Sequence, residues 1–259
     1  MNASPISTYR FVLAALLTFA FFRVESARAI ESPRTCEDVF QKASGLKRIS
    51  RRRIDSRVEI VHIAQQHSFL SYDREPPELR ERTVESQFAQ AQYILKNPGA
   101  IVFVEGWNHR EFFSGKHWDN FFAERVLAAF PQGFPDSLEK LTEAQKSKLY
   151  EEGGAETLFY LGLIPRPLPT GSRFEKMRER QIKSEILLRS LSPGYKEWKQ
   201  REVLDRREQS AVRVILQTVG SRSYGGQKII LVFGRSHNFS KYFVGYDVDF
   251  SRVETLDHK

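Results

Sequence analysis

Val58-Glu59-Ile60-Val61-His62-Ile63-Ala64-Gln65-Gln66-His67 is an apolar run of β type that ends in a short turn and a histidine. The same pattern returns in Ile229-Ile230-Leu231-Val232-Phe233-Gly234-Arg235-Ser236-His237, and a third apolar run, Ile101-Val102-Phe103-Val104, ends in Glu105. In an α/β sheet the carboxyl ends of parallel strands lie together at one edge. We therefore expect His67, Glu105 and His237 to share one crevice.

The periodicities along the chain predict an α/β fold with a central, mostly parallel sheet and flanking helices. Strand, helix and strand within about fifty residues form a right-handed βαβ unit. A proline-punctuated stretch, about residues 118–191, predicts a helical insertion that covers the strand ends. Strands are expected at 57–64, 100–104, 228–233 and 246–255, and helices at 36–44, 78–96, 118–130, 137–151, 155–163, 174–191, 195–219 and 238–243.

The first 29 residues have the pattern of a signal peptide. Arg10 precedes an apolar run from Phe11 to Phe22, and Ala27-Arg28-Ala29 is a small-x-small cleavage site. We expect cleavage before Ile30, a single domain at 30–259 and a periplasmic or secreted protein without a stable membrane span; an uncleaved N-terminal anchor is the alternative. Cys36 is the only cysteine, so the fold depends on packing and on any bound metal.

The chain is basic, with a formal net charge of +8. The densest basic cluster is Lys47-Arg48-Ile49-Ser50-Arg51-Arg52-Arg53. It is interpreted as a solvated segment leading into the first strand, with contact to an anionic lipid, a cell-wall polymer or nucleic acid as the alternative. We expect no nucleic-acid partner, because exported proteins seldom meet nucleic acid.

Two neutral imidazoles and a carboxylate can hold a divalent ion such as Zn²⁺, Mn²⁺, Co²⁺ or Fe²⁺ and leave positions open for water. The ion lowers the pKa of that water to about 7, which supplies hydroxide for attack on a carbonyl. His67, Glu105 and His237 are the predicted ligands. Glu105 needs a partner, because burial of an unpaired charge is costly, and a metal or Arg110 would serve.

Other candidates are interpreted more simply. His62, inside its strand, is predicted to be a core histidine. His109 and His117, in an aromatic-rich loop, could join the site or only pack on the domain. Ser236 stands in a turn resembling a nucleophile elbow, with Asp249 and His258 as triad partners, but Asn238 replaces the second glycine of that motif.

In order and context these motifs resemble the TIKI/TraB superfamily, whose relatives include ChaN-like haem-binding proteins and the erythromycin esterases. The matching segments cover the chain from about Val58 to Leu256: Ala64-Gln65-Gln66-His67, Val104-Glu105 with Arg110, Asp205-Arg206-Arg207-Glu208-Gln209-Ser210-Ala211 and Phe233-Gly234-Arg235-Ser236-His237. The resemblance implies an α/β fold of the erythromycin-esterase and ChaN type, with metal-dependent hydrolysis in some members.

The resemblance also implies that His67, Glu105, Arg207 and His237 line the site. Two departures are visible: Ala64 stands in place of a glycine, and Asp-Arg-Arg-Glu in place of Arg-Asn. The second leaves open whether Arg206 or Arg207 is the matching residue.

Two functional hypotheses follow. The first is an exported, peptidase-like metal-dependent hydrolase acting on a peptide or small molecule, with Glu105, Arg207 and Arg110 in catalytic roles. The second is a protein that binds haem or iron in the same crevice without turnover, with an aromatic wall from Trp107 to Trp118. A fold kept only for interaction is a third.

Overall fold

The computed structural model describes residues 46–66, 70–105, 120–171, 181–182, 185–186 and 188–255. All of them belong to one compact unit, Phe40–Lys259. The predicted signal peptide and Cys36 lie outside the described residues. Among the helices that are described, none is long and apolar enough to cross a membrane.

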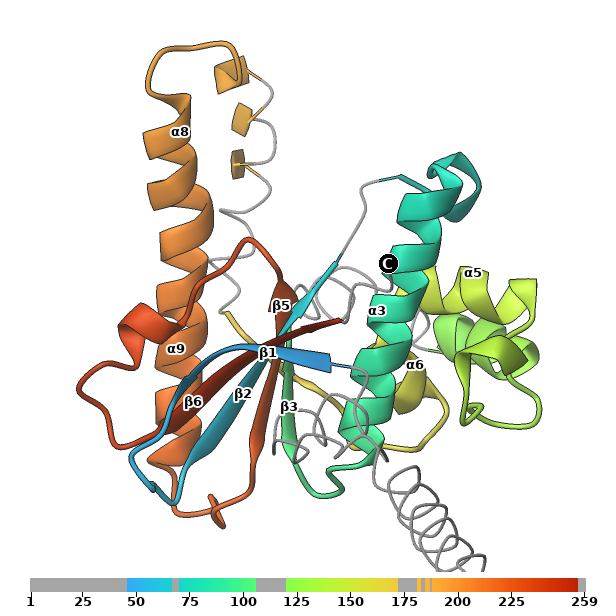
Figure 1. Cartoon of the computed structure of the whole chain (residues 1–259), viewed down its shortest axis with the longest axis horizontal. Helices are drawn as coiled ribbons and strands as arrows, with labels where there is room; N and C mark the ends of the chain where they lie inside the picture. The colour runs from blue at the N-terminus through green and yellow to red at the C-terminus, as the bar shows by residue number, and fades with distance from the viewer. Residues whose placement is uncertain are drawn as a thin grey trace, which may run out of the picture. The chain divides into compact units, whose positions relative to one another are not determined.

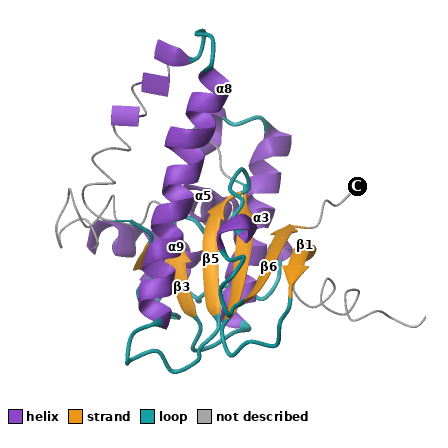
Figure 2. Ribbon diagram, turned by 90° about the vertical axis from the view of Figure 1, so that its left-hand side faces the viewer, coloured by secondary structure: helices purple, strands orange, loops and turns teal. Residues whose placement is uncertain are grey.

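A six-stranded, mostly parallel sheet forms the centre of this unit, in the order β1-β6-β2-β5-β3-β4. The strands are β1 (Leu46–Arg52), β2 (Glu59–Gln65), β3 (Ile101–Val104), β4 (Leu168–Pro169), β5 (Ile229–Gly234) and β6 (Asp249–Thr255). Only β1 is antiparallel to its neighbour, β6. Figure 2 shows the strands side by side, with β1 and β6 toward one edge and β3 toward the other. The predicted α/β class is thereby confirmed.

Alternation along the strands divides the apolar core into two clusters, one on each face of the sheet. Val61 and Ile63 of β2 belong to the cluster on the face that helix α3 (Pro77–Leu95) covers. Ile60, on the same strand, belongs to the cluster that contains residues of helix α9 (Arg206–Val219). Helices α3 and α9 accordingly lie on opposite sides of the sheet (Figure 1). Since both faces are covered, the central strand β5 is buried along its whole length.

The βαβ unit predicted from the sequence is present. Helix α3 (Pro77–Leu95) connects β2 to β3, after the short 3₁₀ turn η1 (Tyr72–Arg74). Helices α5 (Glu143–Glu152) and α6 (Gly154–Tyr160) pack against α3. Residues 120–129 are also helical, and a 3₁₀ turn, η2 (Leu138–Lys140), follows them. A helical cover over the strand ends stays a prediction, because residues 172–180 lie outside the described part of the chain.

The predicted long helix at 195–219 is continuous but not uniform. It consists of α8 (Tyr195–Trp198), a π-helical segment η3 (Lys199–Asp205) and α9 (Arg206–Val219). Its apolar stripe, with Ala211, Val212 and Ile215, is buried in the core. Short π-helical segments occur often at functional sites, and this one ends where the polar site described below begins.

Two strands were not predicted. The basic cluster at 47–53 is largely within β1, an edge strand. Most of its side chains are exposed, as predicted, but the segment is itself a strand and not a lead-in to one. Charged residues suit a sheet edge, because they discourage pairing with other chains. Strand β4 is only two residues long and lies in a proline-rich segment, which gave no strand pattern in the sequence. The remaining predicted strands are present with shifts of up to three residues at their starts, and the short helix at 238–243 is the 3₁₀ turn η4 (Ser240–Tyr242).

The parallel register brings the ends of the central strands to one edge. Gln65 pairs with Gly234, and Val104 pairs with Val232. Residues that follow β2, β3 and β5 therefore emerge close together, as the sequence pattern requires.

Candidate functional site

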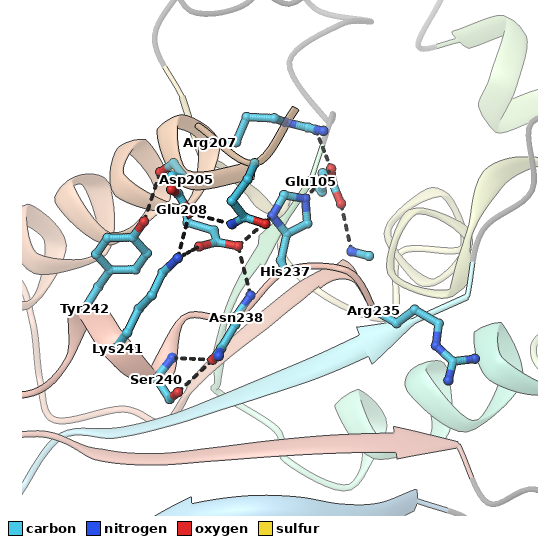
Figure 3. A network of polar contacts seen from close by, with 12 residues as sticks. Glu105, Asp205, Arg207, Glu208, Arg235, His237, Asn238, Ser240, Lys241 and Tyr242 are labelled. Carbon is cyan, nitrogen blue, oxygen red and sulfur yellow. Dashed lines mark hydrogen bonds and ion pairs between the residues drawn. The ribbon is translucent and has the colours of Figure 1, made fainter. Parts of the chain in front are cut away.

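His237 leaves the end of β5 through a tight turn. Its backbone N–H donates to the Gly234 carbonyl at 3.0 Å, and its side chain is only 4% exposed. The rings of Phe233 and Phe239 flank it, with centroid distances of 5.2 and 6.0 Å. This packing holds the imidazole in one place, and Figure 3 shows His237 between Glu105 and Glu208.

Glu105 follows β3 directly and points toward the same place. Its Oε2 accepts a hydrogen bond from the backbone N–H of Gly234 at 2.8 Å. Its Oε1 lies 3.4 Å from Nε2 of His237. The predicted meeting of Glu105 and His237 is thus present in the structure, carried by the ends of two adjacent strands.

Arg207 completes this side of the site from the first turn of α9. Its guanidinium forms an ion pair with Oε1 of Glu105. Arg206 instead pairs with Glu202 at 3.0 Å, and its side chain is 47% exposed. Of the two adjacent arginines, Arg207 is therefore the one at the site. Neighbouring residues on a helix point in directions about 100° apart, so the two side chains face different surroundings. The sequence motif alone could not show which of them faces the site.

Glu208 is the site residue that sequence reasoning missed. Its side chain is 1% exposed, and its Oε1 lies 3.3 Å from Nδ1 of His237. The same oxygen accepts the backbone N–H of Asn238 at 2.9 Å. A sequence signal existed: Glu208 precedes Val212 and Ile215 by four and seven residues, which places a carboxylate on the apolar stripe of the helix.

Lys241 and Asp205 extend the polar network outward. Nζ of Lys241 lies 3.1 Å from Oε2 of Glu208 and 2.6 Å from Oδ1 of Asp205. Basic and acidic side chains alternate along a row that Figure 3 shows, in the order Arg207, Glu105, His237, Glu208, Lys241 and Asp205. Asp205 also accepts a hydrogen bond from the side-chain amide of Gln200 at 2.7 Å.

The charges in this row determine the direction of each pKa shift. Burial alone would lower the pKa of His237, but the contacts with Glu105 and Glu208 raise it above its ordinary value. Burial alone would raise the pKa of Glu208, but His237, the Asn238 N–H and Lys241 lower it. Burial opposes the charge on Lys241 as well, yet Asp205 and Glu208 raise its pKa.

His62 lies below this network in the core, as predicted. It is fully buried, and its ring meets Phe239 edge-on with centroids 4.9 Å apart. Burial, together with the positive charge of Arg252, lowers its pKa to about 3. Neither ring nitrogen makes a hydrogen bond of good geometry within the described part of the chain, and burial favours the neutral ring, in keeping with the predicted core histidine.

Several predicted site residues lie outside the described part of the chain. They are His67, Arg110, His109, His117 and the aromatic segment 107–118. Of the three predicted metal ligands, the described part of the chain therefore includes only Glu105 and His237. Among the described residues, no group of three or more His, Cys, Asp or Glu side chains is arranged to hold an ion.

The two described members do fit an ion as a pair. Two ligands about 2.1 Å from one ion at a tetrahedral angle are about 3.4 Å apart, and Oε1 of Glu105 and Nε2 of His237 have that spacing. Glu208 at the other ring nitrogen is the kind of carboxylate that orients metal-binding histidines. Arg207 contacts the same Glu105 oxygen, so an ion would share that carboxylate with the guanidinium.

The serine-hydrolase alternative is wrong. Ser236 is exposed and lies just beyond the end of β5, whereas Asp249 is the first residue of β6. Since β6 runs parallel to β2 and Asp249 pairs with Glu59, this aspartate lies at the opposite edge of the sheet. The two side chains cannot act together.

Comparisons with protein-family models, with curated proteins and with solved structures find no match to this chain.

Proposed function

We propose that the chain is an exported, metal-dependent hydrolase, peptidase-like in its chemistry, with its reaction centre at Glu105 and His237. The observation that carries the proposal is the setting of the His237 imidazole. One ring nitrogen faces a buried carboxylate, Glu208, and the other faces Glu105 at 3.4 Å. Once the imidazole has lost its proton, this spacing supports coordination of one ion by both Nε2 and the Glu105 carboxylate, with Glu208 as the orienting carboxylate at the other ring nitrogen.

Each residue has a role in this proposal. His237 and Glu105 hold the ion, and His67, which the resemblance places in the site, is the third ligand. A bound divalent ion would supply an activated water for attack on a carbonyl. Arg207 stabilises the negative charge that develops on that carbonyl, because a guanidinium fixed at the site needs little reorganisation. The raised pKa of His237 favours the protonated ring, so ion binding has to displace a proton from the imidazole.

Metal content tests the proposal most directly. Protein purified without chelator is analysed by mass spectrometry for Zn, Mn, Co and Fe, alongside His67→Ala, His237→Ala and Arg206→Ala. We expect close to one ion per chain in the wild type and in Arg206→Ala, and loss of the ion in both histidine variants. A wild type that takes up none of the four metals after loading would refute metal dependence.

Turnover and haem binding are measured on the same preparations. We expect the metal-loaded protein to cleave members of a peptide and ester library, and to lose cleavage after chelation. A Soret band on mixing with haemin that is absent in His237→Ala, without any hydrolysis, would instead favour the haem-binding hypothesis.

A further inference from the structure

Lys241 stands outside the reaction centre proposed above, but it contacts the residue that orients His237. It belongs to the 3₁₀ turn η4, four residues after His237 in the chain. Its ammonium lies between two carboxylates, Asp205 and Glu208, at 2.6 and 3.1 Å. The lysine therefore connects η4, which follows His237 in the chain, to the junction of η3 and α9.

The two oxygens of Glu208 have different partners. Oε1 faces His237 and the Asn238 N–H, whereas Oε2 faces Lys241. The Glu208 side chain is 1% exposed, so its carboxylate depends on these protein partners. Oε2 is held by the charge of the Lys241 ammonium at 3.1 Å and Oε1 lies 3.3 Å from Nδ1 of His237, although neither contact has the geometry of a good hydrogen bond. Removing Lys241 would free Oε2, and the carboxylate could then rotate away from Nδ1 of His237.

We propose that Lys241 is a positioning residue, which acts through Glu208 to fix the imidazole of His237 in the orientation that directs Nε2 toward Glu105. The metal-binding consequence of this role rests on the function proposed above. The orienting contact itself does not, because it concerns only the described side chains. The groups that face Lys241 are Asp205, Glu208 and Tyr242, whose ring lies 4.8 Å from the ammonium.

A purely structural role would have a different signature. If Lys241 only fastened η4 to the helix, its contact with Asp205 would matter as much as its contact with Glu208. Within the described part of the chain, Asp205 contacts Gln200, Lys241 and Tyr242 but not His237, so Asp205→Asn weakens the fastening and leaves Glu208 paired with the lysine. Comparison of the Lys241 and Asp205 variants therefore separates positioning from fastening.

The experiment compares Lys241→Met, Lys241→Arg and Asp205→Asn with the wild type in the full chain. Lys140→Met is the matched control, because Lys140 makes a surface pair with Asp136 at 2.7 Å and belongs to η2. Zn²⁺ affinity is measured by competition with a chromophoric chelator, and folding is checked by circular dichroism and thermal unfolding.

We expect Lys241→Met to bind Zn²⁺ roughly 10- to 100-fold more weakly, the range typical of residues that orient a metal ligand. Lys241→Arg keeps the charge and should recover most of the affinity, while Asp205→Asn and Lys140→Met should stay within about threefold of the wild type, well below that range. An unchanged affinity in Lys241→Met, or an equal loss in Asp205→Asn, would overturn the positioning role.

A second measurement needs neither metal nor substrate. Long-range ¹H–¹⁵N spectra of the metal-free protein, in buffer alkaline enough to keep the imidazole neutral, report which ring nitrogen of His237 carries the proton. We expect a single tautomer with the proton on Nδ1 in the wild type and in Lys140→Met, and a mixture in Lys241→Met. Identical spectra would refute the inference. A wild type that binds no metal but shows the tautomer difference would refute the proposed function and leave the inference standing.

Discussion

Nδ1 of His237 lies 3.3 Å from Oε1 of Glu208, a carboxylate whose side chain is 1% exposed. A buried acid is costly unless it is paired and hydrogen-bonded, and here the imidazole, the Asn238 N–H and Lys241 share that task. The contact joins the end of β5 to the first turn of α9, so the same side chain supports both the fold and the candidate site.

The Glu208→Gln variant tests this double role. The amide keeps the shape but loses the charge, so the Lys241 ammonium and the imidazole lose a common partner. We expect the free energy of unfolding to fall by about 1–3 kcal/mol and Zn²⁺ affinity to fall roughly 10- to 100-fold, measured by urea denaturation and chelator competition. Glu202→Gln, in the ion pair with the exposed Arg206, is the control. Wild-type values for Glu208→Gln in both assays would contradict the interpretation.

The adjacent arginines offer a second matched pair. Arg207 pairs with Glu105 at the site, while Arg206 pairs with Glu202 outside it. Lysine keeps the charge but loses the planar, forked guanidinium. We expect Arg207→Lys to lower the rate of hydrolysis about 10- to 1,000-fold, as for loss of one transition-state donor, and Arg206→Lys to leave it unchanged. Equal rates for the two variants, measured on any substrate found in the library, would remove Arg207 from the mechanism.

Much of the fold could be predicted from the sequence because β2, β3 and β5 are nearly uniform apolar runs. Such runs indicate strands buried on both faces, and parallel strands bring their carboxyl ends together. The juxtaposition of Glu105 and His237 follows from that rule alone. Strand β1 could not be predicted in this way, because its partner β6 is far away in the sequence, with Leu46 paired to Thr255, and β1 has no local signal beyond its charges.

The site could be predicted only in part, for reasons that are also physical. The sequence showed a charged segment at 205–208 on a helix, where solvent exposure is the ordinary outcome. Burial of Glu208 depends on the rotation of α9 about its axis and on the lysine supplied by η4. Both are tertiary features. The same rotation decided between Arg206 and Arg207.

His62 makes the free energy of unfolding fall as the pH falls. Its pKa in the folded state is about 3, against 6.5 for an unperturbed histidine. Below pH 6.5 the unfolded chain therefore takes up a proton that the folded chain does not, and stability falls as the pH falls, by up to about 1.4 kcal/mol per pH unit. We expect His62→Leu to flatten the plot of unfolding free energy against pH between about 4.5 and 6.5, where carboxylates contribute little. A slope equal to that of the wild type would show that His62 becomes protonated in the folded state.

The contribution of His237 to stability changes with pH in the opposite direction to that of His62. Its pKa is raised in the folded state, so its contribution to stability is complete below the unfolded value of about 6.5 and is lost as the pH rises through the folded pKa. With chelator present to keep metal away, the unfolding free energy of the wild type should decline above pH 6.5, and His237→Gln should remove that decline. Urea denaturation at a series of pH values measures both slopes, and a decline that persists in His237→Gln would assign it to another group.

Gly154, the first residue of α6, allows that helix to approach α3 closely. A Cβ built at this position would lie 2.3 Å from the backbone oxygen of Gln87 and 3.2 Å from the backbone nitrogen of Ala91. Alanine raises helix propensity by at most about 1 kcal/mol, whereas overpacking costs about 1–3 kcal/mol or more when the obstacle is backbone. Steric conflict should win, with a net loss of about 2 kcal/mol and a fall in Tm of roughly 4–8 °C.

The comparison variant is Gly220→Ala, at the end of α9. Gly220 has an ordinary φ of −75°, and its nearest obstacle is the Leu216 oxygen at 3.3 Å. A shift of a few tenths of an ångström relieves that contact, so its Tm should change little. If Gly154→Ala unfolds at or above the wild-type Tm in calorimetry while Gly220→Ala does not, α6 lies farther from α3 than described, and the close packing that supports this face of the sheet would have to be revised.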